Sequence, residues 1–79
     1  MVTPVRVPDQ LGPLLRNARL QLGWTQSDVA TRMGVTVQAI SKLEANASRA
    51  SFERIHRLCQ ILGLEILLQP RSAVADAEW

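Results

Sequence analysis

The sequence predicts a small, mostly α-helical protein: a bundle of four to five short helices followed by one short C-terminal β-strand. Apolar residues recur every three or four positions through residues 9–63, the period of helices that bury one face. Capping residues precede the expected helices and glycine follows several of them. At residues 64–69 the period changes toward the alternation of a strand. A chain of 79 residues makes one such domain.

The first helix is expected to begin near Asp9 and to end at about Leu22, after an irregular N-terminal arm at residues 1–8. Gly12 and Pro13 break its pattern, so a start as late as Gly12 is the alternative, because proline is tolerated in the first turn of a helix. The apolar face of this helix consists of Leu11, Leu14, Leu15, Ala18 and Leu22.

The next two helices are expected at residues 26–33 and 37–45, with a tight turn between them. Thr25 and Thr36 precede them as N-caps, whose hydroxyls accept the first free backbone N–H groups. Gly34 ends the first of the two where a left-handed residue is needed. Two helices joined in this way form a helix-turn-helix, and in that motif the second helix lies in the DNA major groove. The motif therefore predicts DNA binding.

A loop at residues 46–50 is expected to lead into a fourth helix, which Ser51 caps and Gly63 ends. The core stripe of this helix consists of Ile55, Leu58, Cys59 and Leu62. Because all four helices carry an apolar face, we expect residues 9–63 to fold as one helix-turn-helix domain.

Residues 64–70 are expected to form a dimerisation strand that ends at Pro70. A fifth helical turn is the alternative, because leucine and glutamate favour helices. A lone strand leaves its backbone groups unpaired and no second strand is evident, so the expected partner is the same strand of a second copy. Antiparallel pairing across a twofold axis would give a symmetric homodimer. The expected dimerisation residues are Leu64, Ile66, Leu67 and Leu68.

Charge is unevenly distributed along the chain, although the net charge is only +2. Eight basic side chains oppose four acidic ones up to Arg57, whereas one basic side chain opposes three acidic ones after it. A cationic helix-turn-helix domain suits contact with DNA phosphates. Residues 71–79 are expected to be a disordered tail, and their acidic character suits a function other than DNA contact. An ordinary solvated surface is the alternative explanation of this asymmetry.

Enzymatic function is disfavoured by the residues present. His56 and Cys59 lie three residues apart, but two ligands make no zinc site, and Cys59 belongs to the core stripe. The chain has no glycine-rich phosphate loop and no nucleophile elbow, so we expect no catalytic residue, metal or cofactor. One cysteine, no signal peptide and no apolar run of membrane-spanning length together predict a cytoplasmic protein without a membrane partner.

Two groups of side chains in and around the motif are expected to contact double-stranded DNA. Gln38 can bond an adenine edge in two places, Lys42 can donate to guanine acceptors or a phosphate, and a small apolar side chain can touch a thymine methyl. Ordinary exposed helix residues are the alternative. The expected base-contacting residues are Val37, Gln38, Ala39 and Lys42. The expected phosphate-contacting residues are Gln26, Thr36, Ser41 and Arg49.

Residues 9–63 resemble the Cro and phage-repressor (XRE) class of helix-turn-helix domains. The resemblance rests on Arg19, Leu22, Gly23, Thr25, Gln26, Val29, Ala30, Gly34, Val35, Ile40, Ser41, Leu43, Glu44, Leu62 and Gly63. It implies that Gln26 and Thr36 hold phosphates and that the four expected base-contacting residues face bases. It also implies that Arg19 pairs with Glu44, a buried ion pair that the neighbouring apolar residues allow.

The whole chain is similar, more specifically, to the HipB-type antitoxins. The similar features are residues 8–11, residues 23–26, the apolar segment after Leu62, and the terminal Glu78 and Trp79. In that family the strand pairs across the dimer, and the dimer represses its own operon and binds the HipA kinase toxin. The resemblance therefore implies a palindromic operator, a second copy and a HipA-like serine/threonine kinase as partners, with Glu78 and Trp79 binding the toxin.

This sequence departs from the HipB pattern in a shorter tail, in Gly12 and Pro13, and in several residues of the segment 37–45. The operator sequence is therefore not transferable. Two other functions stay open: a stand-alone XRE repressor without a toxin, and a protein-interaction module that has lost DNA binding. A neighbouring kinase-like gene would favour the antitoxin over the first, and salt-dependent DNA binding would exclude the second.

Overall fold

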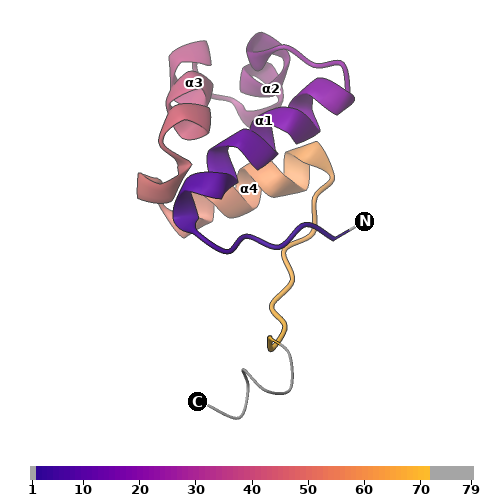
Figure 1. The fold of residues 1–79 in the computed structure, drawn as a ribbon. Coiled ribbons are helices and arrows are strands. Elements are labelled where there is room, and N and C mark those ends of the chain that lie inside the picture. Colours follow the sequence, from indigo (N-terminus) through magenta and orange to yellow (C-terminus); the bar gives the residue numbers. More distant parts are fainter. Residues whose placement is uncertain (1, 72–79) are drawn as a thin grey trace.

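A computed structural model describes residues 2–71 of the chain. Within this range the helices form one bundle, in which α2 and α3 lie together at one end, beside α1 and α4 (Figure 1). The elements, including two short 3-10 helices labelled η, are η1 (Pro8–Gln10), α1 (Leu11–Gln21), α2 (Gln26–Met33), α3 (Val37–Ala45), η2 (Ala47–Arg49) and α4 (Phe52–Leu62).

Helices α2 and α3 have the bounds that the sequence predicts, because side chains at their ends fix them. Thr25 Oγ1 accepts a hydrogen bond from the Asp28 N–H at 3.0 Å, and Asp28 Oδ2 accepts one from the Thr25 N–H at 2.8 Å, which completes a capping box. Thr36 Oγ1 accepts from the Ala39 N–H at 3.1 Å. Gly34 ends α2 at a φ of 72°, in the left-handed region that favours glycine.

The first helix begins between its two expected starts. Residues Pro8–Gln10 form η1, and α1 begins at Leu11 rather than at Asp9 or Gly12. Gly12 is buried in the first turn of α1, where an added Cβ would overlap the backbone carbonyl oxygen of Glu44. The missing side chain therefore allows α1 to approach the C-terminal end of α3 closely.

The core lies where the four α-helices meet, and α4 buries the stripe that the sequence predicts. On α3, Ile40 and Leu43 point into this core, so the opposite side of α3 faces outward. Burial raises the pKa of the Cys59 thiol, which fits a packing role for that residue. The buried residues are Leu15, Val29, Ala30, Met33, Ile40, Leu43, Ala47, Ile55, Leu58, Cys59 and Leu62.

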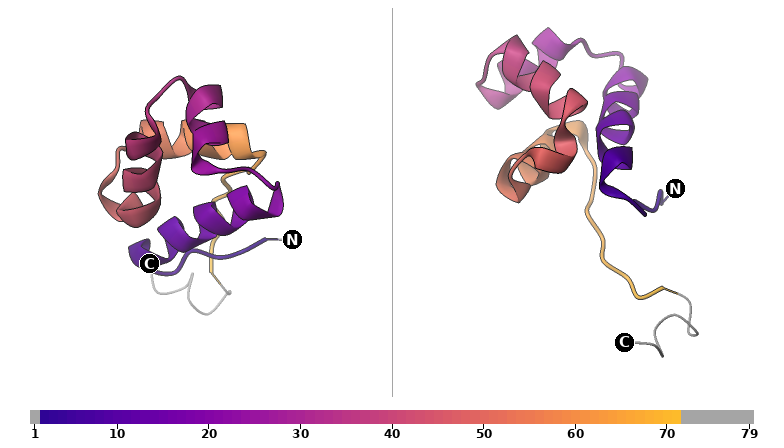
Figure 2. Two further views of the ribbon diagram at one scale, coloured as in Figure 1. Left: turned by 90° about the horizontal axis from the view of Figure 1, so that it is seen from above. Right: turned by 60° about the vertical axis from the view of Figure 1, so that its left-hand side comes forward.

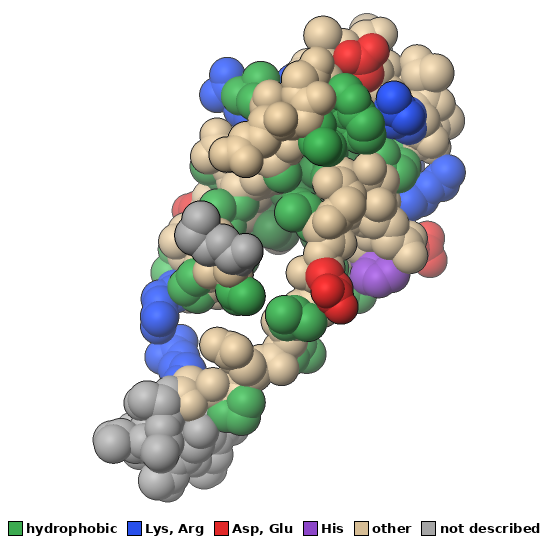
Figure 3. Space-filling model, turned by 90° about the vertical axis from the view of Figure 1, so that its right-hand side faces the viewer, with side chains coloured by type: hydrophobic (Ala, Val, Ile, Leu, Met, Phe, Trp, Pro, Cys, Tyr) green, Lys and Arg blue, Asp and Glu red, His purple; other side chains and the backbone are tan. Residues whose placement is uncertain are grey.

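The segment after α4 differs from both expectations. Gly63 ends α4 in the left-handed region, and the chain then runs on as irregular structure, so residues 2–71 contain neither the strand expected at 64–70 nor a fifth helical turn. A strand is defined by ladder hydrogen bonds to a neighbour, and none of the residues 2–71 of the single chain pairs with this segment in that way. The segment leaves the bundle on the side away from α2 and α3 (Figure 2). Its apolar side chains are exposed to solvent (Figure 3), with Leu68 97% exposed.

The expected tail begins at Arg71, the last described residue, so Glu78 and Trp79 lie outside the described residues. Throughout residues 2–71, every helix is too short or too polar to cross a lipid bilayer. The part of the chain that carries the predicted DNA contacts is therefore fully described, whereas the predicted toxin contacts are not.

Candidate nucleic-acid interface

Helix α3 presents the four expected base-contacting residues on the side away from the core. Val37, Gln38 and Lys42 are exposed, and Ala39 is half-buried. Their common orientation follows from helical geometry, because the inward positions of the same helix carry Ile40 and Leu43. The exposed side of α3 thus combines amide, ammonium and small apolar groups, which are the groups that contact base edges in a major groove.

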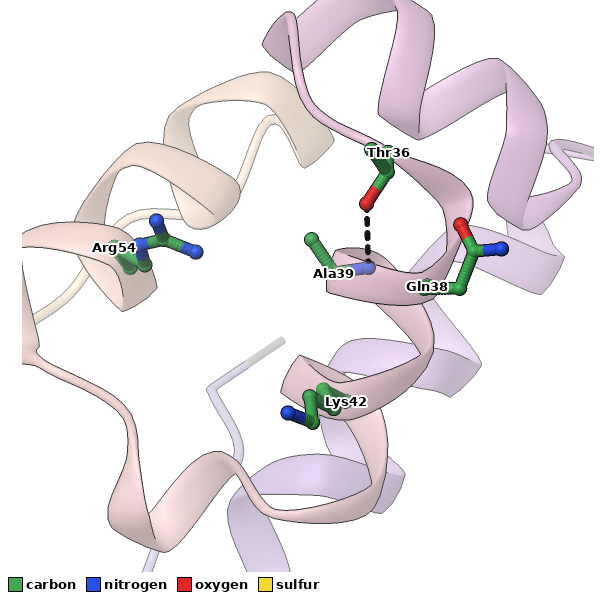
Figure 4. A pocket seen from close by; sticks show the side chains of 5 residues that line it. All are labelled: Thr36, Gln38, Ala39, Lys42 and Arg54. Carbon is green, nitrogen blue, oxygen red and sulfur yellow. Dashed lines mark hydrogen bonds between the residues drawn. The ribbon is translucent and has the colours of Figure 1, made fainter.

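An open pocket of about 390 Å³ lies between α3 and α4. It is lined by Gln38, Ala39 and Lys42, by the α3 cap Thr36, and by Arg54 of α4. Lys42 and Arg54 extend toward this space from the two helices, whereas the side chain of Gln38 points away from Arg54 (Figure 4). The lining has two cationic side chains and no carboxylate, so the pocket is electrostatically suited to an anionic group.

The expected phosphate-contacting residues are distributed more widely. Thr36 lines the pocket, whereas Ser41 of α3 and Arg49 of η2 are exposed outside it. Gln26 begins α2 and is half-buried, and its Nε2 donates a hydrogen bond to Glu44 Oε1 at 3.1 Å. One amide hydrogen of Gln26 is therefore engaged within the fold, and the second remains available to a phosphate oxygen.

The expected Arg19–Glu44 pair is present. Arg19 Nε donates to Glu44 Oε2 at 2.6 Å, and Nη2 donates to Oε1 at 3.1 Å, with both side chains 8% exposed. Arg19 Nη1 also donates to the backbone carbonyl of Trp24 at 2.8 Å. These charge-assisted bonds connect α1, the segment before α2, and α3, and the bond from Gln26 to Glu44 adds α2 to the same network.

Arg54 lines the pocket but is not among the residues that the sequence predicts to contact DNA. It belongs to a helix outside the motif, and only the packed bundle brings the first turn of α4 beside α3. The sequence held one cue: Arg54 is a cation in the first turn of a helix, where the helix dipole disfavours positive charge.

Metal-binding groups do not gather in the part of the chain that the structure describes. Within residues 2–71, the structure contains no group of three or more histidine, cysteine, aspartate or glutamate side chains that could hold an ion. Cys59 is buried while His56 is exposed, so the two are differently placed despite their short spacing.

The fold and this surface together define a helix-turn-helix protein, with a second motif helix exposed beside a cationic pocket. The helix-turn-helix family model matches residues 15–68. The chain belongs to this family and, within it, to the group of the HipB-type antitoxins.

Similarity to individual proteins extends over most of the chain. Antitoxin HipB of Escherichia coli is 33% identical over an alignment of 79 positions, which covers 91% of this chain and 84% of that protein. An uncharacterised HTH-type transcriptional regulator of Methanothermobacter thermautotrophicus is 42% identical over 52 residues, covering 66% of this chain and 75% of that protein.

Two solved structures of HipB complexes have the same fold. A HipB-O1-O2 complex has a TM-score of 0.79 at 29% identity, covering 86% of this chain and 99% of that chain. A complex of a HipB variant with an O2 20mer also has a TM-score of 0.79, at 28% identity, covering 87% of this chain and 96% of that chain.

Proposed function

We propose that this chain is a homodimeric DNA-binding antitoxin that represses its own operon and neutralises a HipA-like serine/threonine kinase toxin. The observation that carries the DNA-binding part is the exposed side of α3, where Gln38, Ala39 and Lys42 line a cationic pocket. The shared fold of the HipB complexes with O1 and O2 supports the same role.

Base contacts come from α3 in this proposal. Gln38 bonds the two hydrogen-bonding groups of an adenine edge, and Lys42 donates to guanine acceptors. Val37 or Ala39 contacts a thymine methyl group. The support is their shared outward orientation, with Val37 41% exposed although its side chain is apolar.

Phosphate contacts hold the motif against the DNA backbone. Gln26 and Thr36 stand at the starts of α2 and α3, where free backbone N–H groups and the positive end of the helix dipole favour an anion. Ser41 and Arg49 add side-chain donors. The hydrogen bond from Gln26 to Glu44 supports this arrangement, because it restricts the orientation of the Gln26 amide.

Dimerisation uses residues 64–70, which pair antiparallel with the same segment of a second copy. The support is the exposed apolar surface of Leu64, Ile66, Leu67 and Leu68, which are 40%, 39%, 57% and 97% exposed in the single chain. Strand pairing would satisfy the backbone groups of this segment and cover part of its apolar surface. In such a dimer the two copies of α3 reach successive major grooves, roughly 34 Å apart, on a palindromic operator.

Toxin binding is assigned to the tail, with Trp79 filling a pocket on the kinase and Glu78 meeting basic groups around it. The support is similarity to antitoxin HipB over nearly the whole chain and the terminal aromatic residue in an otherwise polar, alanine-rich segment. The acidic tail would be repelled by DNA phosphates, so operator binding does not need it.

Two truncations test the division of functions. Deleting residues 64–79 should give a monomer in light scattering that binds DNA poorly, whereas deleting residues 71–79 should weaken only binding to the kinase in calorimetric titration. A chain without residues 64–79 that remains a full dimer would point to pairing through helices. Equal kinase affinities with and without residues 71–79 would remove the tail from the toxin-binding model.

A stand-alone repressor without a toxin is the second candidate. Similarity over 52 residues to the uncharacterised HTH-type transcriptional regulator of Methanothermobacter thermautotrophicus supports a role in transcription regulation. Co-purification of the full chain with the product of its neighbouring gene separates the two functions. A stable complex with a kinase-like protein supports the antitoxin, and its absence supports the repressor.

A further inference from the structure

We propose that Arg54, in the first turn of α4, binds a phosphate of the DNA backbone across the pocket from Lys42. The proposal rests on the proposed DNA-binding function and adds to it a contact from outside the helix-turn-helix. It also gives α4 a part in DNA binding, in addition to its packing role in the core.

The charges around the pocket favour this assignment. Lys42 and Arg54 extend toward the same space from α3 and α4 (Figure 4). In the described part of the chain the one ion pair joins Arg19 to Glu44, so no described carboxylate neutralises either cation of the pocket. A phosphate between them would be attracted by both, and the planar guanidinium of Arg54 can offer it two parallel N–H donors.

The position of Arg54 within α4 points to the same ligand. Ser51 caps this helix, and its Oγ accepts from the Arg54 backbone N–H at 3.3 Å, which places Arg54 in the first turn. A cation at this end of a helix is disfavoured by the helix dipole. A bound anion would offset that repulsion and would itself be favoured by the dipole, so DNA binding removes an unfavourable interaction of the free protein.

A phosphate contact is favoured over a base contact because of the helix that carries Arg54. The proposed base-contacting residues lie on α3, and Arg54 approaches the pocket from α4 on its other side. A side chain beside the groove-facing helix meets the sugar–phosphate backbone, which carries no direct sequence information. Arg54 should therefore increase affinity for every duplex by a similar factor.

The test measures fluorescence anisotropy of the full chain on two labelled duplexes, one selected from a random pool and one of scrambled sequence, across a series of salt concentrations. Arg54→Ala should weaken both complexes by the same factor, roughly threefold to tenfold, and lower the salt slope by about one for each bound protomer. Arg57→Ala is the matched control, because Arg57 is exposed on the same helix but does not line the pocket. Arg57→Ala should leave affinity near that of the wild type.

Other results of this binding experiment would overturn either the Arg54 contact or DNA binding as a whole. Equal losses for Arg54→Ala and Arg57→Ala would indicate a general charge effect and overturn the proposal. A loss confined to the selected duplex would indicate a base contact and also overturn it. An Arg54→Ala chain with unchanged melting temperature and wild-type binding would overturn it while leaving the proposed function intact. A wild-type chain that binds neither duplex would instead refute DNA binding itself.

Discussion

Arg19 and Glu44 form a nearly buried ion pair between α1 and α3, with Arg19 Nε 2.6 Å from Glu44 Oε2 and both side chains 8% exposed. Glu44 accepts two hydrogen bonds from Arg19 and one from Gln26, so one carboxylate connects α1, α2 and α3. The Glu44 carboxylate therefore links both motif helices to α1 through an ion pair and a hydrogen bond that are largely shielded from water.

Replacing Glu44 with alanine should destabilise the fold by about 3 kcal/mol, because it leaves the Arg19 cation buried without a counter-charge. Replacing both residues together, as Arg19→Met with Glu44→Leu, should cost clearly less, because no uncompensated charge remains. Urea unfolding of the three variants measures the difference. A double variant that is as unstable as Glu44→Ala would show that the loss comes from packing rather than from the unpaired charge.

Replacing Gly12 with alanine should destabilise the protein by roughly 1–3 kcal/mol, because the added Cβ overlaps the Glu44 carbonyl oxygen and forces α1 away from α3. Within a helix alanine is more favourable than glycine by about 1 kcal/mol, so helix propensity alone would predict that Gly12→Ala stabilises the protein. Asn17→Ala, on an exposed position of the same helix, is the control and should be neutral or slightly stabilising. Thermal melting that ranks both variants alike would contradict the close approach.

The Asp28 carboxylate should contribute to acid sensitivity. Hydrogen bonds from the Thr25 backbone N–H and hydroxyl hold the pKa of Asp28 below its ordinary value of 3.8. Because the folded pKa lies below the unfolded one, this stabilisation is complete above the unfolded value and is lost as pH falls through the folded value. Asp28→Asn should therefore lose less stability on acidification than the wild type. Melting curves across the acidic range test this, with Asp9→Asn, outside any capping box, as the control.

If Gln38 contacts a base, replacing it should reduce the sequence specificity of DNA binding. Gln38→Ala should cost about 1–3 kcal/mol on the selected DNA site and relax the base preference at one position. Gln60→Ala changes another exposed glutamine, on α4, and should leave binding unchanged. Unaltered affinity and base preference in Gln38→Ala would remove Gln38 from the proposed contacts.

Local chemistry explains which parts of the fold were predictable from the sequence. Thr25, Thr36 and Gly34 fix the ends of α2 and α3 through bonds to their own neighbours, so those bounds follow from the residues alone. The close approach of α1 to α3 depends on Gly12 and the distant Glu44, and no local sequence pattern encodes it. The strand expected at residues 64–70 was not found, because strand formation depends on a paired neighbour.

In the candidate site, too, features set within one helix were predictable from the sequence, whereas features set by packing between helices were not. Outward orientation of Gln38 and Lys42 follows from the helical period, since Ile40 and Leu43 occupy the inward positions. The contribution of Arg54 and the hydrogen bond from Gln26 to Glu44 arise only when separate helices pack together. Site residues that share one helix were therefore easier to predict from the sequence than contacts between residues of different helices.

The most direct test of the account is selection of bound duplexes from a random DNA pool by the full chain, followed by a measurement of stoichiometry on the enriched site. We expect a palindrome whose half-sites lie roughly 34 Å apart, two chains per site, and an affinity that falls steeply with salt. No enriched sequence, or one chain bound with an affinity insensitive to salt, would contradict a homodimeric helix-turn-helix repressor.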